Sequence, residues 1–176
     1  MSIVLMGYMG CGKSSIGKRL SSKLNMEYLD LDNYLEKKEQ KSIKQIFEDY
    51  GEIYFRRKET EYLKEVLEMY PDAIISLGGG TPCFAGNIEV IKESITAKSV
   101  YLKTSLEELV DRLFKEKDNR PLIAHIEDKE SLKDFIRKHL FERSFYYNQA
   151  AFVIATDDKT IDAVVGEIKE VLFQNR

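Results

Sequence analysis

Short apolar runs recur along the chain, and longer amphipathic segments separate them. Each run is four or five residues long, is rich in β-branched or aromatic side chains, and does not alternate with polar residues. Runs of this kind are typical of strands that are buried on both faces, as in a parallel sheet. The predicted strands are residues 2–6, 27–30, 73–77, 98–102 and 151–155.

The segments between the runs carry apolar residues at helical spacing. Between residues 106 and 114 they recur at i, i+3, i+4, i+7 and i+8, and similar series begin at Leu132 and Ile161. Strands that alternate with helices predict a doubly wound α/β fold, with a mostly parallel five-stranded sheet flanked by helices. Because no segment has the composition of a linker, we expect residues 1–176 to form a single domain.

Composition and charge narrow the possible partners. The 176 residues are 43% hydrophobic, which suits one sizeable core. A net charge of −3, from 27 basic and 30 acidic residues, argues against nucleic acid or an anionic membrane as a partner. The chain has no apolar run of about 18 residues and no basic signal-like start. We therefore expect a cytoplasmic protein with reduced cysteines and, without a heptad pattern, a monomer.

A glycine-rich motif follows the first predicted strand. Residues 7–14, GYMGCGKS, fit G-x-x-x-x-G-K-[ST] in the strand–helix context that this motif requires. Its glycines allow positive φ, its backbone N–H groups can form an anion nest, and the next helix adds a positive N-terminus. We expect Lys13 to reach the β- and γ-phosphates and Ser14 to offer a hydroxyl to Mg²⁺. The predicted nucleotide-binding residues are Gly10, Cys11, Gly12, Lys13, Ser14 and Ser15.

The motif alone does not choose among the classes of phosphate-binding proteins. A switch GTPase would need D-x-x-G and N/T-K-x-D motifs, and neither is present. Two kinds of protein remain possible at this point. One is a small-molecule kinase, whose acceptor could be an acid, a gluconate-like compound or a nucleotide. The other is a protein that has the fold of such a kinase and binds the same ligands without catalysis.

Further motifs, taken in order, resemble those of the shikimate kinase family. They are LDLD at 29–32, GEIYFRRKE at 51–59, SLGGG at 76–80, RPL at 120–122 and an arginine in FERSFYY at 141–147. The resemblance implies a P-loop kinase with a mobile lid, about residues 112–126, and an acceptor region at about residues 31–60. It also implies Mg²⁺-dependent transfer of the γ-phosphoryl of ATP to the 3-hydroxyl of shikimate, in aromatic amino acid biosynthesis.

Two carboxylates mark the end of the second predicted strand. Asp30 and Asp32 are two residues apart, so we expect their side chains on one side of the strand, at the sheet edge that faces ligands. The resemblance implies that Asp30 holds Mg²⁺ through water and that Asp32 hydrogen-bonds the reacting hydroxyl. An alternative is that Asp32 only caps the following helix.

Two arginines are predicted to face inward. Arg56 extends the apolar stripe that contains Leu63, whereas its neighbour Arg57 falls on the solvent face, and Arg143 extends a second stripe. A guanidinium fork suits a carboxylate ligand, and a structural ion pair is the alternative for each buried arginine. The resemblance implies that Arg56 and Arg143 bind the acid group of shikimate and that the N–H of Gly79 binds the same substrate.

The polar stretch at 114–130 is predicted to be a lid. The resemblance implies that Arg120 moves onto the γ-phosphate as the phosphoryl group is transferred, and that Arg112 packs on adenine, although Arg112 is equally consistent with a solvated charge. We interpret His125 as lid surface and His139 as a hydrogen-bonded helix residue.

Overall fold

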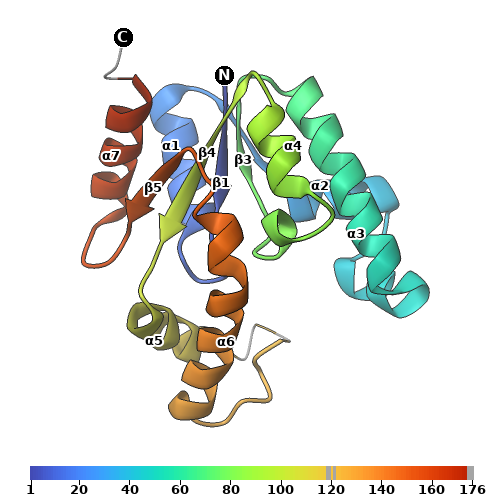
Figure 1. Ribbon diagram of the computed structural model, residues 1–176, viewed down its shortest axis with the longest axis vertical. Helices are drawn as coiled ribbons and strands as arrows, with labels where there is room; N and C mark the ends of the chain where they lie inside the picture. The colour runs from blue at the N-terminus through green and yellow to red at the C-terminus, as the bar shows by residue number, and fades with distance from the viewer. Residues whose placement is uncertain (118–119, 121, 174–176) are drawn as a thin grey trace.

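A parallel five-stranded sheet forms the centre of the computed structural model, which describes residues 1–117, 120 and 122–173 (Figure 1). The strand order is β2-β3-β1-β4-β5, so β1 is central and the chain winds outward on both sides. Every neighbouring pair is parallel. The strands are β1 (Ser2–Met6), β2 (Glu27–Asp30), β3 (Ala73–Ser76), β4 (Ala97–Lys103) and β5 (Phe152–Ala155). The predicted strands and the doubly wound fold are thus confirmed.

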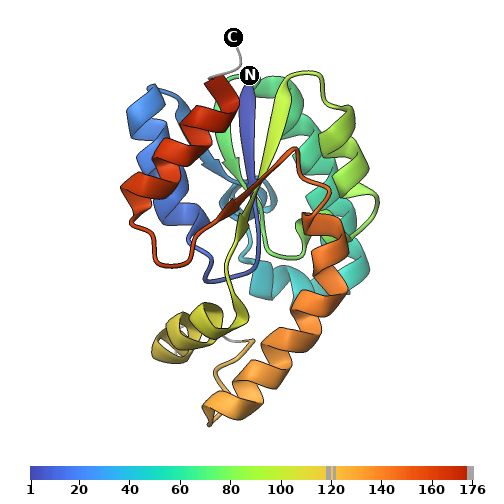
Figure 2. The ribbon, with the colours of Figure 1, turned by 60° about the vertical axis from the view of Figure 1, so that its left-hand side comes forward.

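Helices cover both faces of the sheet, and two of them extend beyond its carboxyl edge. Figures 1 and 2 show α1 and α7 together on one face and α3 with α4 on the other, while α5 and the first turns of α6 lie below the strand ends. The helices are α1 (Lys13–Leu24), α2 (Leu31–Glu39), α3 (Ile43–Met69), the 3₁₀ turn η1 (Thr81–Cys83), α4 (Asn87–Glu93), α5 (Leu106–Glu116), α6 (Lys129–Tyr147) and α7 (Ile161–Phe173).

The core explains why the strand runs do not alternate. All five residues of β1 and all four of β3 are buried, since helices pack on both faces of these strands. None of the helices in the described part of the chain combines the length and apolarity that a membrane crossing requires.

The helix α3 is broken at Gly51. Its backbone there has φ 80° and ψ 176°, a conformation that only glycine adopts without strain, so residues 43–50 form an arm that leaves the axis of the longer segment. A capping box between Ser42 and Gln45 starts this arm. The break places Arg56 in the second turn of a new helical segment, with its side chain toward the sheet edge.

The polar stretch after α5 is attached to the core by two apolar side chains. Ile123 is fully buried and Ile126 nearly so, while His125 between them is exposed, as predicted. A backbone hydrogen bond from Ile123 to the Arg120 carbonyl shapes the turn. The predicted lid includes residues 118, 119 and 121, which lie outside the described part of the chain.

Candidate functional site

The loop between β1 and α1 has the geometry of a phosphate cradle. Gly7, Gly10 and Gly12 adopt φ of 147°, 81° and 97°, as the motif predicted. The first turn of α1 contains no acidic residue and no side-chain cap, so its N–H groups are available to an anion. The Nζ of Lys13 donates to the carbonyls of Gly7 (2.8 Å) and Tyr8 (3.0 Å). These bonds hold the ammonium group beside the cradle.

A pocket of about 300 Å³ lies over this cradle, at the carboxyl edge of the sheet. It joins the phosphate loop to the ends of β2 and β3 and to the stretch after α5. Its polar and charged lining includes Lys13, Ser14, Ser15, Asp30, Asp32, Glu116 and Arg120, with the backbone of Gly78 and Gly79. Most of the predicted nucleotide and metal residues therefore meet in one cavity, whose lining comes from four separate stretches of chain.

Asp30 and Asp32 do not both lie on β2, so the prediction that they share the end of this strand is wrong. Asp30 ends β2 and caps α2 by accepting a hydrogen bond from the N–H of Asn33 (3.2 Å). Asp32 lies in the first turn of α2. The cap is therefore Asp30, and the carboxylate of Asp32 is free to face the pocket because capping does not engage it.

The environment of Asp32 weakens its acidity. The pKa of Asp32 is raised from 3.8 to about 6, mainly by burial and also by the negative charges of Asp30 and Glu59, while the positive charge of Lys13 opposes this rise. A carboxylate with a pKa near neutrality is a better proton acceptor than an ordinary one.

Oxygen donors for a hard cation are present in the same pocket. The described residues contain no cluster of three or more acidic, histidine or cysteine side chains suited to a metal ion. Mg²⁺ commonly needs only one or two protein ligands because nucleotide phosphates and water supply the others. The hydroxyl of Ser14 and the carboxylate of Asp30, which line the pocket together, fit that requirement.

Three consecutive glycines bring the acceptor-side residues together. A Cβ added to Gly78 would lie 2.9 Å from Oδ1 of Asp32, and one at Gly80 would lie 3.1 Å from Nη2 of Arg56. Between them, a Cβ at Gly79 would lie 3.6 Å from Nη1 of Arg143. None of the three has positive φ, so Gly78 and Gly80 are required for space and not for conformation, whereas a Cβ at Gly79 would make only ordinary contacts.

Arg56 faces inward, as its helical phase predicted, and it is also ion-paired. Its side chain is one-fifth exposed, its Nη1 lies 2.8 Å from Oε2 of Glu59, and its Nε lies 3.6 Å from Oε1 of Glu52. The ring of Phe84 stacks on the guanidinium at 3.9 Å. Arg57 is exposed. The structural ion pair that was the alternative hypothesis for Arg56 is therefore present, and it holds the guanidinium beside Gly80.

Glu59 is a supporting residue that the sequence analysis missed. Its side chain is almost fully buried, and its two oxygens divide between Arg56 and the hydroxyl of Thr81, which donates at 2.6 Å. One carboxylate thus joins the arginine to the start of η1, directly after the glycines. The available signal was its position three residues after Arg56, on the same face of the helix.

Arg143 has no ion pair with any residue that the structure describes. It is half-buried in α6, with its Cζ 5.5 Å from the centre of the Tyr8 ring. His139 accepts or donates one hydrogen bond with Tyr8, as expected of a hydrogen-bonded helix residue. That its partner belongs to the phosphate loop was not predicted.

Two further arginines approach the nucleotide side. Arg120 lines the pocket and donates from Nη2 to Glu116 (2.8 Å). Arg112 bonds Glu108 through Nε (2.8 Å) and the Gly10 carbonyl through Nη1 (3.3 Å), beside a second hollow of about 250 Å³ that is also lined by Cys11. Arg112 is thus attached to the phosphate loop and is not a fully solvated charge.

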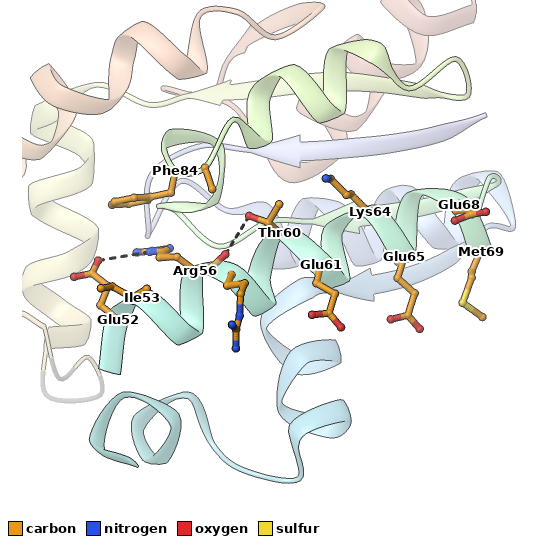
Figure 3. A pocket seen from close by; sticks show the side chains of 12 residues that line it. Glu52, Ile53, Arg56, Thr60, Glu61, Lys64, Glu65, Glu68, Met69 and Phe84 are labelled. Atoms are coloured by element: carbon orange, nitrogen blue, oxygen red, sulfur yellow. Dashed lines mark hydrogen bonds and ion pairs between the residues drawn. The ribbon is translucent and has the colours of Figure 1, made fainter. Parts of the chain in front are cut away.

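A larger groove, of about 1190 Å³, follows the outer side of α3. Figure 3 shows Arg56, Glu52 and Phe84 at one end of it and Glu68 and Met69 at the other. Of the predicted site residues, only Arg56 lines this groove. The convergence of charged groups over the phosphate loop therefore marks the smaller pocket as the candidate active site.

Comparison with known proteins identifies the family of this chain. The sequence model of the family described as Shikimate kinase matches residues 9–173. This chain belongs to the shikimate kinase family. A shikimate kinase of Flavobacterium johnsoniae is 51% identical over 97% of this chain and 98% of its own length.

Two solved shikimate kinases have the same fold. The crystal structure of the enzyme from Bacteroides thetaiotaomicron superimposes with a TM-score of 0.89 at 35% identity, and covers 98% of both chains. The enzyme from Acinetobacter baumannii, solved in complex with shikimate, has a TM-score of 0.85 at 32% identity over 99% of this chain and 94% of that one. The five-stranded sheet and its flanking helices are thus those of a shikimate kinase.

Proposed function

We propose that this chain transfers the γ-phosphoryl group of ATP to the 3-hydroxyl of shikimate, giving shikimate 3-phosphate and ADP. The observation that carries the proposal is the approach of Asp32, Arg143 and Arg56 to three successive glycines beside the phosphate cradle. A ring acid needs both a cationic clamp for its carboxylate and an acceptor for its hydroxyl proton, and this arrangement supplies both. The enzyme acts in the cytoplasm as a monomer, without nucleic acid.

The nucleotide side neutralises charge on the phosphates. Lys13 releases the loop carbonyls and binds the β- and γ-phosphates, while the N–H groups of Gly10, Cys11, Gly12 and Ser15 surround them. Ser14 and Asp30 would hold Mg²⁺, and the bound ion would supply positive charge at the transferring group. Arg120 approaches the γ-phosphate and stabilises the charge that spreads over its oxygens during transfer.

The acceptor side positions the alcohol. Arg56 and Arg143 bind the shikimate carboxylate and the N–H of Gly79 binds the ring substituents, so that the 3-hydroxyl lies between Asp32 and the γ-phosphate. Asp32 accepts the hydrogen bond of that hydroxyl, and its raised pKa favours acceptance of the proton. The proton leaves the hydroxyl as its oxygen forms the bond to phosphorus.

Steady-state assays test this function. We expect turnover with shikimate to exceed turnover with gluconate or a nucleoside monophosphate, and the Lys13→Met and Asp32→Asn variants to lose roughly 10²–10⁴-fold in kcat. Circular dichroism of each variant checks that the fold is retained. Equal turnover with another acceptor would contradict shikimate as the substrate. Near-normal kcat in either folded variant would contradict the catalytic role assigned to the substituted residue.

A further inference from the structure

One face of α6 carries three side chains that reach the ligand loops. His139, Arg143 and Tyr147 follow each other at intervals of four residues, so they project from the same side of the helix. This helix runs from below the sheet up beside η1 (Figure 2). The position of α6 therefore decides where the guanidinium of Arg143 is held.

The first of these side chains is attached to the phosphate loop. The hydroxyl of Tyr8 lies 3.1 Å from Nδ1 of His139, and Tyr8 is only 1% exposed. A buried hydroxyl requires a partner, and this is the bond that the structure gives it. The ring of Phe135 packs on His139 with centroids 4.3 Å apart, which further restrains the imidazole.

The last of the three is attached to the glycine loop. The hydroxyl of Tyr147 donates to the carbonyl of Gly79 at 2.5 Å, and its ring packs on Tyr101 in the sheet. Arg143 thus lies midway between two anchors, one on each ligand loop. Its guanidinium also lies beside the ring of Tyr8, at 5.5 Å from the centroid.

We propose that Tyr8 and His139 are a pair of positioning residues that hold Arg143 toward the acceptor carboxylate. Through this pair, the side chain of Tyr8, a residue of the phosphate loop, affects the affinity for shikimate. The inference rests on the proposed function, because it takes Arg143 to be a shikimate ligand. Tyr8 contributes to the cradle itself through its backbone carbonyl, which accepts from Lys13, so removal of the hydroxyl leaves that contact in place.

Titration calorimetry with shikimate and with an ATP analogue tests the pair. In Tyr8→Phe, which loses one hydrogen bond, we expect about five-fold weaker shikimate binding and less than about two-fold change for the analogue. We expect His139→Leu to have the same effect and the double variant to be no worse than either single one, because the two residues act through one contact. His139→Asn, whose amide reaches the place of Nδ1, is expected to restore most of the affinity.

Two controls separate the possible failures. Ser21→Ala removes a hydroxyl that donates to the Met26 carbonyl at the far end of α1, and it is expected to leave both affinities unchanged. Arg143→Leu tests the underlying role, and normal shikimate binding in this variant would contradict the assignment of Arg143 as a shikimate ligand. If Arg143→Leu binds weakly while Tyr8→Phe binds shikimate normally, or if Tyr8→Phe weakens both ligands equally, the positioning pair alone is refuted.

Discussion

Asp32 combines partial burial with two carboxylate neighbours. Its position inside the first turn of α2 places it in the lining of the pocket, while Asp30 caps the helix. Burial is the largest cause of its raised pKa, so the ionised form is present only at the cost of lost hydration. Catalysis and stability consequently place opposite demands on this one side chain.

The pH dependence of catalysis reports this group. In the proposed mechanism the ionised carboxylate accepts the proton, so we expect kcat/KM for shikimate to fall about tenfold per pH unit below the pKa of about 6. The affinity for an ATP analogue over the same range serves as the control. A kcat/KM that stays constant down to pH 5 would contradict the role of Asp32.

The stability of the folded chain should change in the opposite sense. A raised pKa means that Asp32 favours folding below its ordinary value of 3.8 and that this contribution is lost as pH rises through about 6. At pH 7.5 we therefore expect Asp32→Asn to increase the free energy of unfolding, by on the order of 2 kcal/mol, while turnover is lost. Urea unfolding at pH 7.5 and pH 4.5 measures this, and an equal effect at both values would count against it.

At the scale of elements, the loop after β3 offers a matched comparison. Gly78→Ala and Gly79→Ala each add one methyl group, at adjacent positions of the same loop. At Gly78 the new Cβ would lie 2.9 Å from the Asp32 carboxylate, whereas at Gly79 the nearest atoms are 3.5 and 3.6 Å away. We expect Gly78→Ala to cost about 1–3 kcal/mol of stability and Gly79→Ala to cost less than about 1 kcal/mol. Denaturant midpoints measure the difference, and equal midpoints would show that the loop relaxes freely.

Hydrophobic patterns predict elements that are uniform along their length. The strands, the phosphate loop and the inward phase of Arg56 were predicted because each follows from local spacing and from the layered geometry of an α/β fold. The break of α3 at Gly51 was not, since a glycine inside a helical pattern does not reveal its φ.

Features that depend on partners distant in sequence were also missed. The Tyr8–His139 bond joins residues 131 positions apart, and the burial of Ile123 depends on how the stretch after α5 meets the core. The capping of α2 by Asp30 and not by Asp32 has a more local cause, because β2 ends at Asp30 and α2 begins with the next residue, Leu31.

At the scale of the whole molecule, the strand order brings the two ligand sites together. With β1 beside β3, the phosphate loop and the triple glycine leave the same edge of the sheet from neighbouring strands. In open α/β sheets, ligands usually bind outside the carboxyl ends of the strands, at the point where the strand order reverses. Binding of either substrate should therefore stabilise the entire fold.

Thermal unfolding measures that linkage. A nucleotide analogue at about 100 times its Kd adds about 2.7 kcal/mol, which should raise Tm by roughly 5–10 °C in a chain of this size. We expect Lys13→Met to lose most of this nucleotide-dependent increase and to keep the increase caused by shikimate. If the variant retained the full nucleotide effect, Lys13 would not be a phosphate ligand.

The break at Gly51 divides α3 into a short arm, residues 43–50, and a longer segment. The long segment after it carries Arg56 and most of the buried residues of α3, while the arm before it is anchored by the buried Ile46 and by aromatic pairs such as Phe47 with Phe55. Nothing lies within 4 Å of a Cβ placed at Gly51. We therefore expect substitutions on the exposed face of the arm to accumulate in evolution without any shift in the helical register of Arg56, because the break separates the two segments.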